Sequence, residues 1–293
     1  MRFTKMHGLG NDYVYVNCFE EKIENPAKLA QIVSDRHRGI GADGLILIGR
    51  SQTADVQMRI FNADGSEAEM CGNGIRCVAK YAYEHKLAQT GGLFSIPDQP
   101  PLCSASLNIE TGNGILTVGL MVDDRDKVQR VCVNMGQPVL RPKDIPVNLS
   151  REKVVEQAIE ILGEELLMTC VSMGNPHAIF FCDNVEFIEL EKLGPAIENH
   201  SLFPNRVNVH FVQVDNSTEF TIRTWERGSG VTMACGSGAC AACVAAVLTC
   251  RCERICVGHL PGGDLNLNWY EENNCVYMTG PAVEVFEGVW PEK

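Results

Sequence analysis

The sequence predicts an α+β protein made of two homologous halves, each with a strand-rich sheet and one conspicuous helix. Three observations support this. The length of 293 residues suits two domains better than one. Short sequence landmarks recur at one constant spacing, which indicates a duplicated unit. Runs typical of strands outnumber runs typical of helices, and both kinds occur in each half.

The clearest repeat contains two cysteines. Cys71 opens the run Cys-Gly-Asn-Gly, and Cys235 opens Cys-Gly-Ser-Gly 164 positions later. A glycine turn before a strand or helix is common, so one such match would carry little weight. Three further pairs share the spacing: Arg59–Asn62 with Arg223–Glu226, Gly10–Asn11 with Gly174–Asn175, and Gly44–Leu47 with Asn208–Phe211.

Each predicted element follows from its pattern of apolar residues. Period-2 or β-branched runs predict strands at Asp12–Asn17, Gly44–Ile48, Val56–Phe61, Gly114–Val122 and Val207–Val214. Helical patterns occupy Pro26–Arg36, Gly74–Lys86, Lys153–Leu162 and Gly238–Arg251. Each half therefore has helices to cover its sheet.

The expected domains are residues 1–129 with 280–293, carrying Cys71, and residues 130–279, carrying Cys235. The charged stretch Asp123–Arg130 is the expected crossing between the halves. The tail Thr279–Trp290 is expected to return to the first half as a strand. The stretch Gly91–Ser104, rich in Pro and Gly, is expected to be a surface loop.

Composition excludes several classes of function. The formal net charge of −12 and the lack of a basic stripe argue against a nucleic-acid partner. No secretory signal is seen, and the longest small-apolar run, Ala239–Leu248, is too short to span a membrane. We therefore expect a cytoplasmic protein without a membrane partner. Most of the 14 cysteines should be free thiols packed as small apolar groups.

The two repeated cysteines are the candidate catalytic groups. Each precedes a helix, where backbone N–H groups and the helix dipole favour a thiolate and can also hold a carboxylate. Inversion of a stereocentre needs a base on one face and an acid on the other, and two homologous halves supply such a pair. We found no spacing typical of a metal site and no pyridoxal-phosphate signature, so no metal and no cofactor are expected.

The motifs resemble those of diaminopimelate epimerases. The resemblance is carried by Phe61–Ser66 and Cys71–Cys77, together with Gly8–Asp12, Gly174–His177, Val207–Val209, Trp225–Gly228 and Ala234–Gly238. It spans nearly the whole chain. It implies two pseudo-symmetric domains, each a β-sheet or barrel wrapped on a central helix, with the active site in the cleft between them. It also implies cofactor-independent conversion of LL- to meso-diaminopimelate, a step in lysine and cell-wall precursor biosynthesis.

The same resemblance assigns site residues. Cys71 and Cys235 would be the acid and base. The non-reacting end of a small-molecule substrate, diaminopimelate, would be held by Asn62, Asn175, Asn208 and Arg227, with Glu226 beside its amino group. Asn11 and His177 would line the cleft. Gly72, Asn73, Gly236 and Ser237 would present amides to the reacting carboxylate. The oligomeric state stays open, with a homodimer as one candidate.

Two features depart from the family pattern. Gly44 stands where some members have glutamine, which removes a side-chain contact, and the Gly91–Ser104 loop is long for the family.

Two alternatives remain. A two-cysteine proline or hydroxyproline racemase would share the mechanism but needs less polar machinery for the distal end of its substrate. An iron–sulfur electron carrier is suggested by the C-x4-C-x2-C spacing of Cys235, Cys240 and Cys243. A continuous helix over Ala239–Leu248 would argue against that reading.

Overall fold

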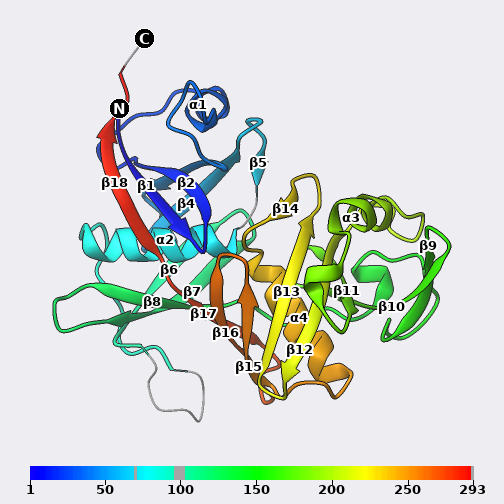
Figure 1. The fold of residues 1–293 in the computed structure, drawn as a ribbon. Helices are drawn as coiled ribbons and strands as arrows, with labels where there is room; N and C mark the ends of the chain where they lie inside the picture. The colour runs from blue at the N-terminus through cyan, green and yellow to red at the C-terminus, as the bar shows by residue number, and fades with distance from the viewer. Residues whose placement is uncertain (69–70, 96–102, 292–293) are drawn as a thin grey trace. The chain divides into compact units, whose positions relative to one another are not determined.

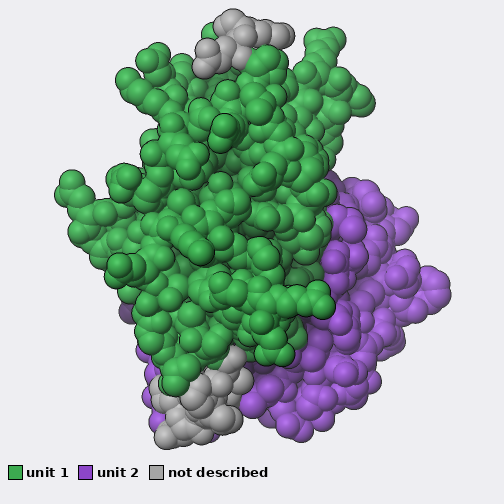
Figure 2. Space-filling view, turned by 90° about the vertical axis from the view of Figure 1, so that its left-hand side faces the viewer, with its two compact units in different colours: residues 1–134, 279–293 green, residues 135–278 purple. Residues whose placement is uncertain are grey.

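The computed structural model describes residues 1–68, 71–95 and 103–291. The chain divides into two compact units, coloured separately in Figure 2. The first unit comprises residues 1–134 and 279–293, and the second comprises residues 135–278. The end of the chain is thus part of the unit in which the chain begins.

The first unit is a mixed sheet with two helices (Figure 1). Hydrogen-bonded neighbours follow the order β18–β1–β2–β3–β4–β6–β7–β8, with the short β5 also paired to β4. The elements are β1 (Arg2–Gly8), β2 (Asn11–Asn17), α1 (Pro26–Ser34), β3 (Gly44–Gly49), β4 (Val56–Asn62), β5 (Glu67–Ala68), α2 (Gly72–Glu84), β6 (Ala105–Thr111), β7 (Gly114–Val122), β8 (Val128–Asn134) and β18 (Val283–Val289).

The second unit repeats this arrangement. Its strand order is β9–β10–β11–β12–β13–β15–β16, with β14 paired to β13. The elements are β9 (Gln157–Ile161), β10 (Glu164–Ser172), β11 (Pro176–Phe181), α3 (Leu190–Glu198), β12 (Asn208–Asn216), β13 (Glu219–Glu226), β14 (Gly230–Thr232), α4 (Gly236–Leu248), β15 (Ile255–Leu260) and β16 (Gly263–Trp269). Two 3-10 turns, Pro142–Asp144 and Val185–Phe187, and strand β17 (Val276–Gly280) complete the described elements.

The registers of the strands repeat at the spacing read from the sequence. Tyr13 pairs with Gly44 between the parallel strands β2 and β3, and His177 pairs with Asn208 between β11 and β12. Both helices of the first unit recur in the second unit, 164 positions later and with the same lengths, α1 as α3 and α2 as α4. The duplication therefore extends from sequence motifs to hydrogen-bond register.

Each unit wraps its strands around one helix, which confirms the predicted fold class. Helix α2 contacts β1, β3, β4, β6, β7 and β8, and α4 contacts β10, β11, β12, β15 and β16. Helix α4 is made of small apolar residues and is buried along nearly its whole length, as expected for a helix that is apolar on all sides. No helix among the described residues has both the length and the apolar character needed to cross a bilayer.

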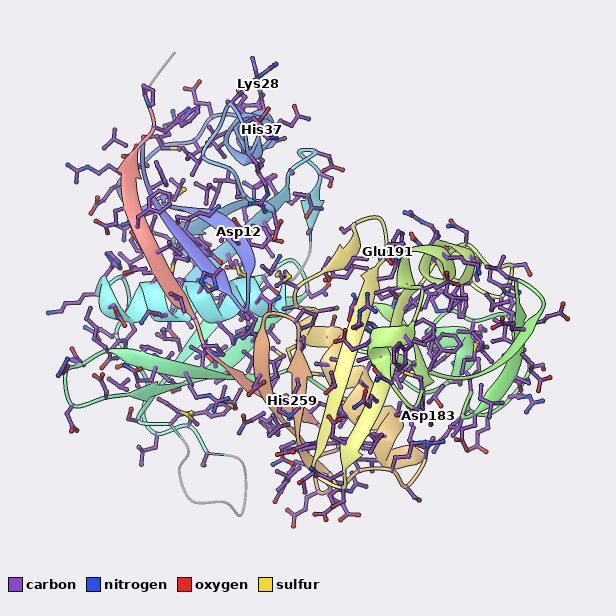
Figure 3. All side chains as sticks on the ribbon, viewed as in Figure 1. Asp12, Lys28, His37, Asp183, Glu191 and His259 are labelled. Atoms are coloured by element: carbon purple, nitrogen blue, oxygen red, sulfur yellow. The ribbon has the colours of Figure 1, made fainter. Side chains whose placement is uncertain are left out.

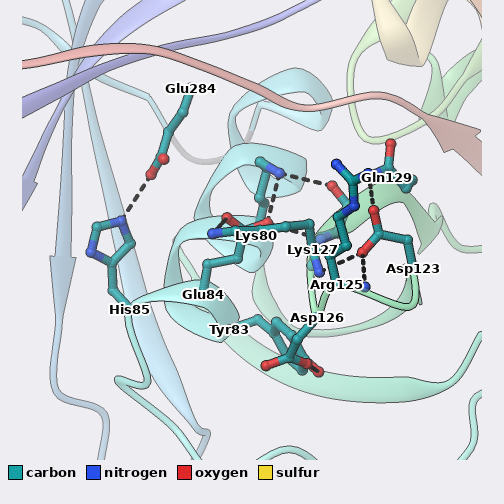
Figure 4. A network of polar contacts seen from close by, with 11 residues as sticks. Lys80, Tyr83, Glu84, His85, Asp123, Arg125, Asp126, Lys127, Gln129 and Glu284 are labelled. Atoms are coloured by element: carbon teal, nitrogen blue, oxygen red, sulfur yellow. Dashed lines mark hydrogen bonds and ion pairs between the residues drawn. The ribbon is translucent and has the colours of Figure 1, made fainter.

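Ion pairs hold the C-terminal end of α2, which is the end farthest from Cys71 (Figure 4). Glu84, almost buried, accepts from Lys80 at 2.7 Å and from Lys127 at 2.9 Å. His85 contacts Glu284 of β18 at 2.9 Å. These contacts join the helix to the β7–β8 turn and to the returning tail, so the helix is held in place within its unit.

The helix predicted over Lys153–Leu162 is wrong. Residues Gln157–Ile161 form β9, antiparallel to β10. Ile159 and Ile161 are buried while the residue between them is exposed, which is the alternation of a strand. Leu162 and Gly163 both have positive φ, 53° and 87°, as a two-residue hairpin turn requires.

The other segment predictions have mixed outcomes. Asp123–Arg130 does not cross between the units. It forms the β7–β8 turn and the start of β8. The tail, expected to return as a strand, forms β18 and pairs antiparallel with β1. Of the loop at 91–104, residues 96–102 lie outside the described part of the chain.

Candidate active site

Cys71 is the N-cap of α2. Its Sγ accepts a hydrogen bond from the backbone N–H of Gly74 at 3.3 Å. A Cβ at Gly74 would lie 2.7 Å from Ile46 Cδ1 and 3.6 Å from the Cys71 sulfur, so glycine allows the first turn of the helix to pack closely here. The thiol therefore lies at the positive end of the helix, where a thiolate is stabilised and a carboxylate can be bound.

Asn11, at the start of β2, lies beside this cysteine. The Cys71 thiol is 3.5 Å from Asn11 Oδ1, and the Asn73 side-chain amide donates to the same oxygen at 3.3 Å. The Asn11 amide donates in turn to Asp43 Oδ2 at 2.8 Å. Asp43 also accepts from Arg36 at 2.9 Å. Both ends of the Asn11 amide are thus fixed, with its oxygen toward the sulfur.

A buried arginine organises the turn that carries Cys71. The Arg76 side chain is fully buried. Its guanidinium donates to Gly72 O at 3.0 Å, to Asn73 Oδ1 at 3.0 Å and to Pro281 O at 3.1 Å. The planar group binds three acceptors at once, which a lysine could not do. Arg76 therefore joins the first turn of α2 to the returning tail.

Cys235 is the N-cap of α4 in the second unit and is 5% exposed. Its Sγ lies 3.8 Å from the hydroxyl of Ser237. Gly236 is buried in the first turn of the helix, so this cysteine, like Cys71, lies at a helix N-terminus with a glycine after it. The two repeated motifs thus place their cysteines at the same helix position, and Cys71 in addition caps its helix with a side-chain hydrogen bond.

A chain of buried polar groups lies near Cys235. His177 Nε2 contacts Asn175 Oδ1 at 2.8 Å, and His177 Nδ1 contacts His210 Nε2 at 2.9 Å. His210 Nδ1 contacts the Thr224 hydroxyl at 2.9 Å. Burial lowers the pKa of His210 to about 3. Burial first, and then the positive charge of Arg227 and any proton on His210, hold the pKa of His177 well below its usual range. Both rings are therefore neutral at pH 7.

Other histidines have ordinary surroundings. His37 lies exposed in the turn after α1, and His259 on β15 pairs with Asp264 at 2.8 Å (Figure 3). Neither belongs to a buried cluster. The environment of the His177–His210 pair therefore differs from that of these two histidines.

The segment after β13 carries two further candidates. Glu226 accepts from Thr232 at 2.6 Å, and the Arg227 backbone N–H donates to Asn208 Oδ1 at 3.0 Å. The Arg227 guanidinium donates to Asn205 O at 3.0 Å. Asn208 is nearly buried and donates to Pro176 O at 2.9 Å. These contacts gather Asn208, Glu226 and Arg227 at one end of β12 and β13.

Comparison with known proteins decides the family. The family model described as diaminopimelate epimerase matches residues 3–141 and 169–285. A diaminopimelate epimerase of Acetivibrio thermocellus is 53% identical over 288 residues, covering 98% of both chains. One of Agathobacter rectalis is 51% identical over 295 residues, again covering 98% of both. The chain belongs to the diaminopimelate epimerase family.

Solved structures share the fold of this epimerase family at low identity. A Bacillus anthracis phenazine biosynthesis protein of the PhzF family aligns with a TM-score of 0.68 at 18% identity, covering 98% of both chains. A probable proline racemase of Agrobacterium radiobacter K84 aligns with a TM-score of 0.68 at 13% identity, covering 100% of this chain and 93% of the other. These likenesses show the architecture alone.

The duplication relates site residues of this epimerase-family chain to one another. Asn11 and Asn175 are equivalent positions, and so are Asn62 and Glu226. Asn62 ends β4 and donates to the Ser66 hydroxyl at 3.0 Å. Within the first unit the structure gathers Asn11, Cys71, Gly72 and Asn73. Within the second it gathers Asn175 with His177, and Asn208 with Glu226 and Arg227.

Gly44 has no room for a side chain. A Cβ built there would lie 2.2 Å from Phe61 O and 2.8 Å from the Tyr13 ring. A glutamine here, as expected in some members of the family, would require a shift of the β4 backbone, because Phe61 and Tyr13 already fill the space.

Three organising residues were not identified from the sequence. Arg76 lies within the Cys71–Cys77 motif and His210 within the repeated segment Asn208–Phe211, but nothing in the sequence assigned either one a role. Glu198, 5% exposed, accepts from Arg206 at 3.1 Å, from Trp225 Nε1 at 2.7 Å and from the Gly228 N–H at 3.0 Å. It therefore supports the segment that carries Arg227. Glu198 is followed by Asn199 and His200 in a mixed polar and apolar stretch, so the sequence carried no signal that could have marked it.

Proposed function

We propose that this protein interconverts LL- and meso-2,6-diaminopimelate without a cofactor, with Cys71 and Cys235 as the acid–base pair. One sulfur removes the α-proton as a thiolate. The other, as a thiol, delivers a proton to the opposite face of the carbon. After one turnover the cysteine that removed the proton is a thiol and the other is a thiolate. The two sulfurs must then exchange protons with solvent before the same direction of reaction can occur again.

The observation that carries the proposal is the matched placement of the two cysteines. Each is the N-cap of a 13-residue helix, and the two helices occupy equivalent positions of a duplicated unit. The first-turn amides, at Gly72 and Asn73 and at Gly236 and Ser237, suit the reacting carboxylate. Hydrogen bonds to that carboxylate stabilise the charge that moves into it as the proton leaves.

The distal end of the substrate is the second part of the proposal. Arg227 has a planar fork suited to a carboxylate, and Glu226 is suited to an ammonium group. Asn62, Asn175 and Asn208 add neutral hydrogen bonds. Diaminopimelate carries both a carboxylate and an amino group at its far end. Proline and hydroxyproline do not, which favours diaminopimelate over the racemase alternative.

The test is incubation of the reduced, metal-free protein with LL-diaminopimelate, followed by chiral chromatography. We expect meso product without any added cofactor, and no racemisation of L-proline under the same conditions. Turnover of proline in place of diaminopimelate would replace the proposal with the racemase alternative. Absence of turnover on both would refute it.

A further inference from the structure

Three side chains with metal-binding atoms meet in the second unit. His177 of β11, His210 of β12 and Cys235 at the start of α4 are buried, and one ligand atom of each lies within 4.8 Å of the other two. Among the residues that the structure describes, these three form a group of histidine, cysteine or acidic side chains close enough together to hold a metal ion. Two imidazoles and one thiolate form a ligand set typical of Zn²⁺.

The outer nitrogens of both rings are already held. His177 Nε2 lies 2.8 Å from Asn175 Oδ1, and His210 Nδ1 lies 2.9 Å from the Thr224 hydroxyl. In metal sites, a ligating histidine commonly donates its other N–H to such a fixed oxygen. Gly238 packs against the second ring, since a Cβ there would lie 2.2 Å from His210 Cε1. The facing nitrogens are thus oriented before any ion binds.

We propose that His177, His210 and Cys235 bind a divalent cation of borderline softness, typified by Zn²⁺, and that the ion blocks the enzyme by occupying Cys235. The inhibitory part rests on the proposed function, whereas the binding part does not. Tetrahedral zinc would hold these atoms roughly 3.4 to 3.6 Å apart, so each side chain has to move by less than about 1 Å. The fourth ligand position is left for water.

The proton balance of binding is simple. The Cys235 thiol gives its proton to solvent as the sulfur–metal bond forms. The proton shared by the facing nitrogens moves to an outer ring nitrogen, where Asn175 Oδ1 or the Thr224 hydroxyl accepts it. No oxidant or reductant takes part, and the imidazoles gain no charge.

The first unit provides an internal control. The positions equivalent to His177, His210 and Cys235 are Tyr13, Ile46 and Cys71. A Cβ at Gly74 would lie 2.7 Å from Ile46 Cδ1, so an aliphatic side chain takes the place of the second imidazole. The two cysteines share a helix-capping position, but only Cys235 has histidines at the two equivalent neighbouring positions. Metal binding should therefore depend on Cys235 and not on Cys71.

The experiment measures binding separately from turnover. Reduced protein freed of metal is titrated with Zn²⁺ by calorimetry and with Co²⁺ by absorption, which reports thiolate coordination. We expect one tight site, weakened at least tenfold by Cys235→Ser and by His210→Gln, and about tenfold by Thr224→Val. Cys71→Ser and His259→Gln should leave it unchanged, and Mg²⁺ should not compete. Circular dichroism checks that each variant is folded.

Two results would overturn the inference. If His210→Gln and Thr224→Val both bind Zn²⁺ with wild-type affinity, or if Cys71→Ser weakens binding as much as Cys235→Ser, the ion is bound elsewhere. If the site behaves as expected but the zinc-loaded protein epimerises diaminopimelate at the metal-free rate, the inhibitory part is wrong. Binding data decide the first question even if the protein does not turn over diaminopimelate.

Discussion

The thiol of Cys71 lies 3.5 Å from the side-chain oxygen of Asn11, although 60 residues separate them in the chain. Asn11 cannot rotate its amide without losing its hydrogen bond to Asp43, so a neutral oxygen is held against the sulfur. A neutral acceptor opposes ionisation of the thiol only weakly, whereas the full negative charge of a carboxylate would oppose it strongly.

Asn11→Asp should therefore impair proton abstraction. The new carboxylate would repel both the Cys71 thiolate and Asp43, so we expect kcat/KM to fall by about a hundredfold and the pH–rate profile to move to higher pH. Asn113→Asp, in the exposed β6–β7 turn, is the matched control and should behave as wild type. An unchanged profile in Asn11→Asp would remove Asn11 from the environment of the catalytic sulfur.

Arg76→Lys should destabilise the first unit. A lysine ammonium cannot reach the three acceptors that the buried guanidinium binds, and those left unpaired lower the free energy of unfolding by about 2 to 4 kcal/mol. Urea denaturation measures the change. Arg125→Lys is the control: Arg125 is exposed and joins the network of Figure 4 through its backbone N–H, so the midpoint should shift little. Equal stability of both variants would contradict the role given to Arg76.

Glu198→Gln should affect substrate binding more than chemistry. The variant loses the ion pair with Arg206 and weakens the support of the segment carrying Arg227. We expect KM for diaminopimelate to rise at least about fivefold while kcat changes by less than about twofold. Glu191→Gln, exposed on the same helix, is the control (Figure 3). A fall in kcat at constant KM would place Glu198 near the reacting centre instead.

The buried histidines predict a loss of stability in acid. Burial lowers the pKa of His210 to about 3, whereas an unfolded histidine titrates near ~6.5. Between these values the unfolded state binds the extra proton, so the free energy of unfolding falls as pH falls, by up to about 1.4 kcal/mol per pH unit for each such group. Above pH 7 these groups add no pH dependence.

Urea denaturation at pH 7 and pH 5 measures this effect. His210→Gln should reduce the difference in unfolding free energy between the two pH values, while His259→Gln should leave it near that of wild type. If the pH dependence is the same in His210→Gln and wild type, His210 takes up its proton in the folded protein as readily as in the unfolded protein, and the prediction is wrong.

The sequence predicted the elements whose evidence is local. Cys71 and Cys235 were placed at helix starts because a glycine turn followed by a helical pattern is visible within about ten residues. The fold class followed from the repeat. The segment Gln157–Ile161 failed because its short apolar run fits a helix or a strand, and only pairing with β10 decides.

The contacts that organise the site are not local. His177 meets His210 because β11 and β12 are parallel neighbours, a fact that the spacing of 33 residues does not contain. Arg76 reaches Pro281, 205 residues away, only because the tail returns to the first unit. Such contacts depend on topology, which period and propensity do not specify.

The most direct test of the two-cysteine mechanism is proton exchange in D₂O by Cys71→Ala and Cys235→Ala. In wild type, the inverted centre should acquire deuterium while unreacted substrate acquires little at early times. Each variant should lose inversion by orders of magnitude, yet its remaining cysteine can still remove and return a proton on one face. Chiral chromatography and NMR, starting from LL and from meso substrate, should show exchange without inversion, with opposite stereoisomer preferences in the two variants. Inversion at near wild-type rate by either variant would contradict the account.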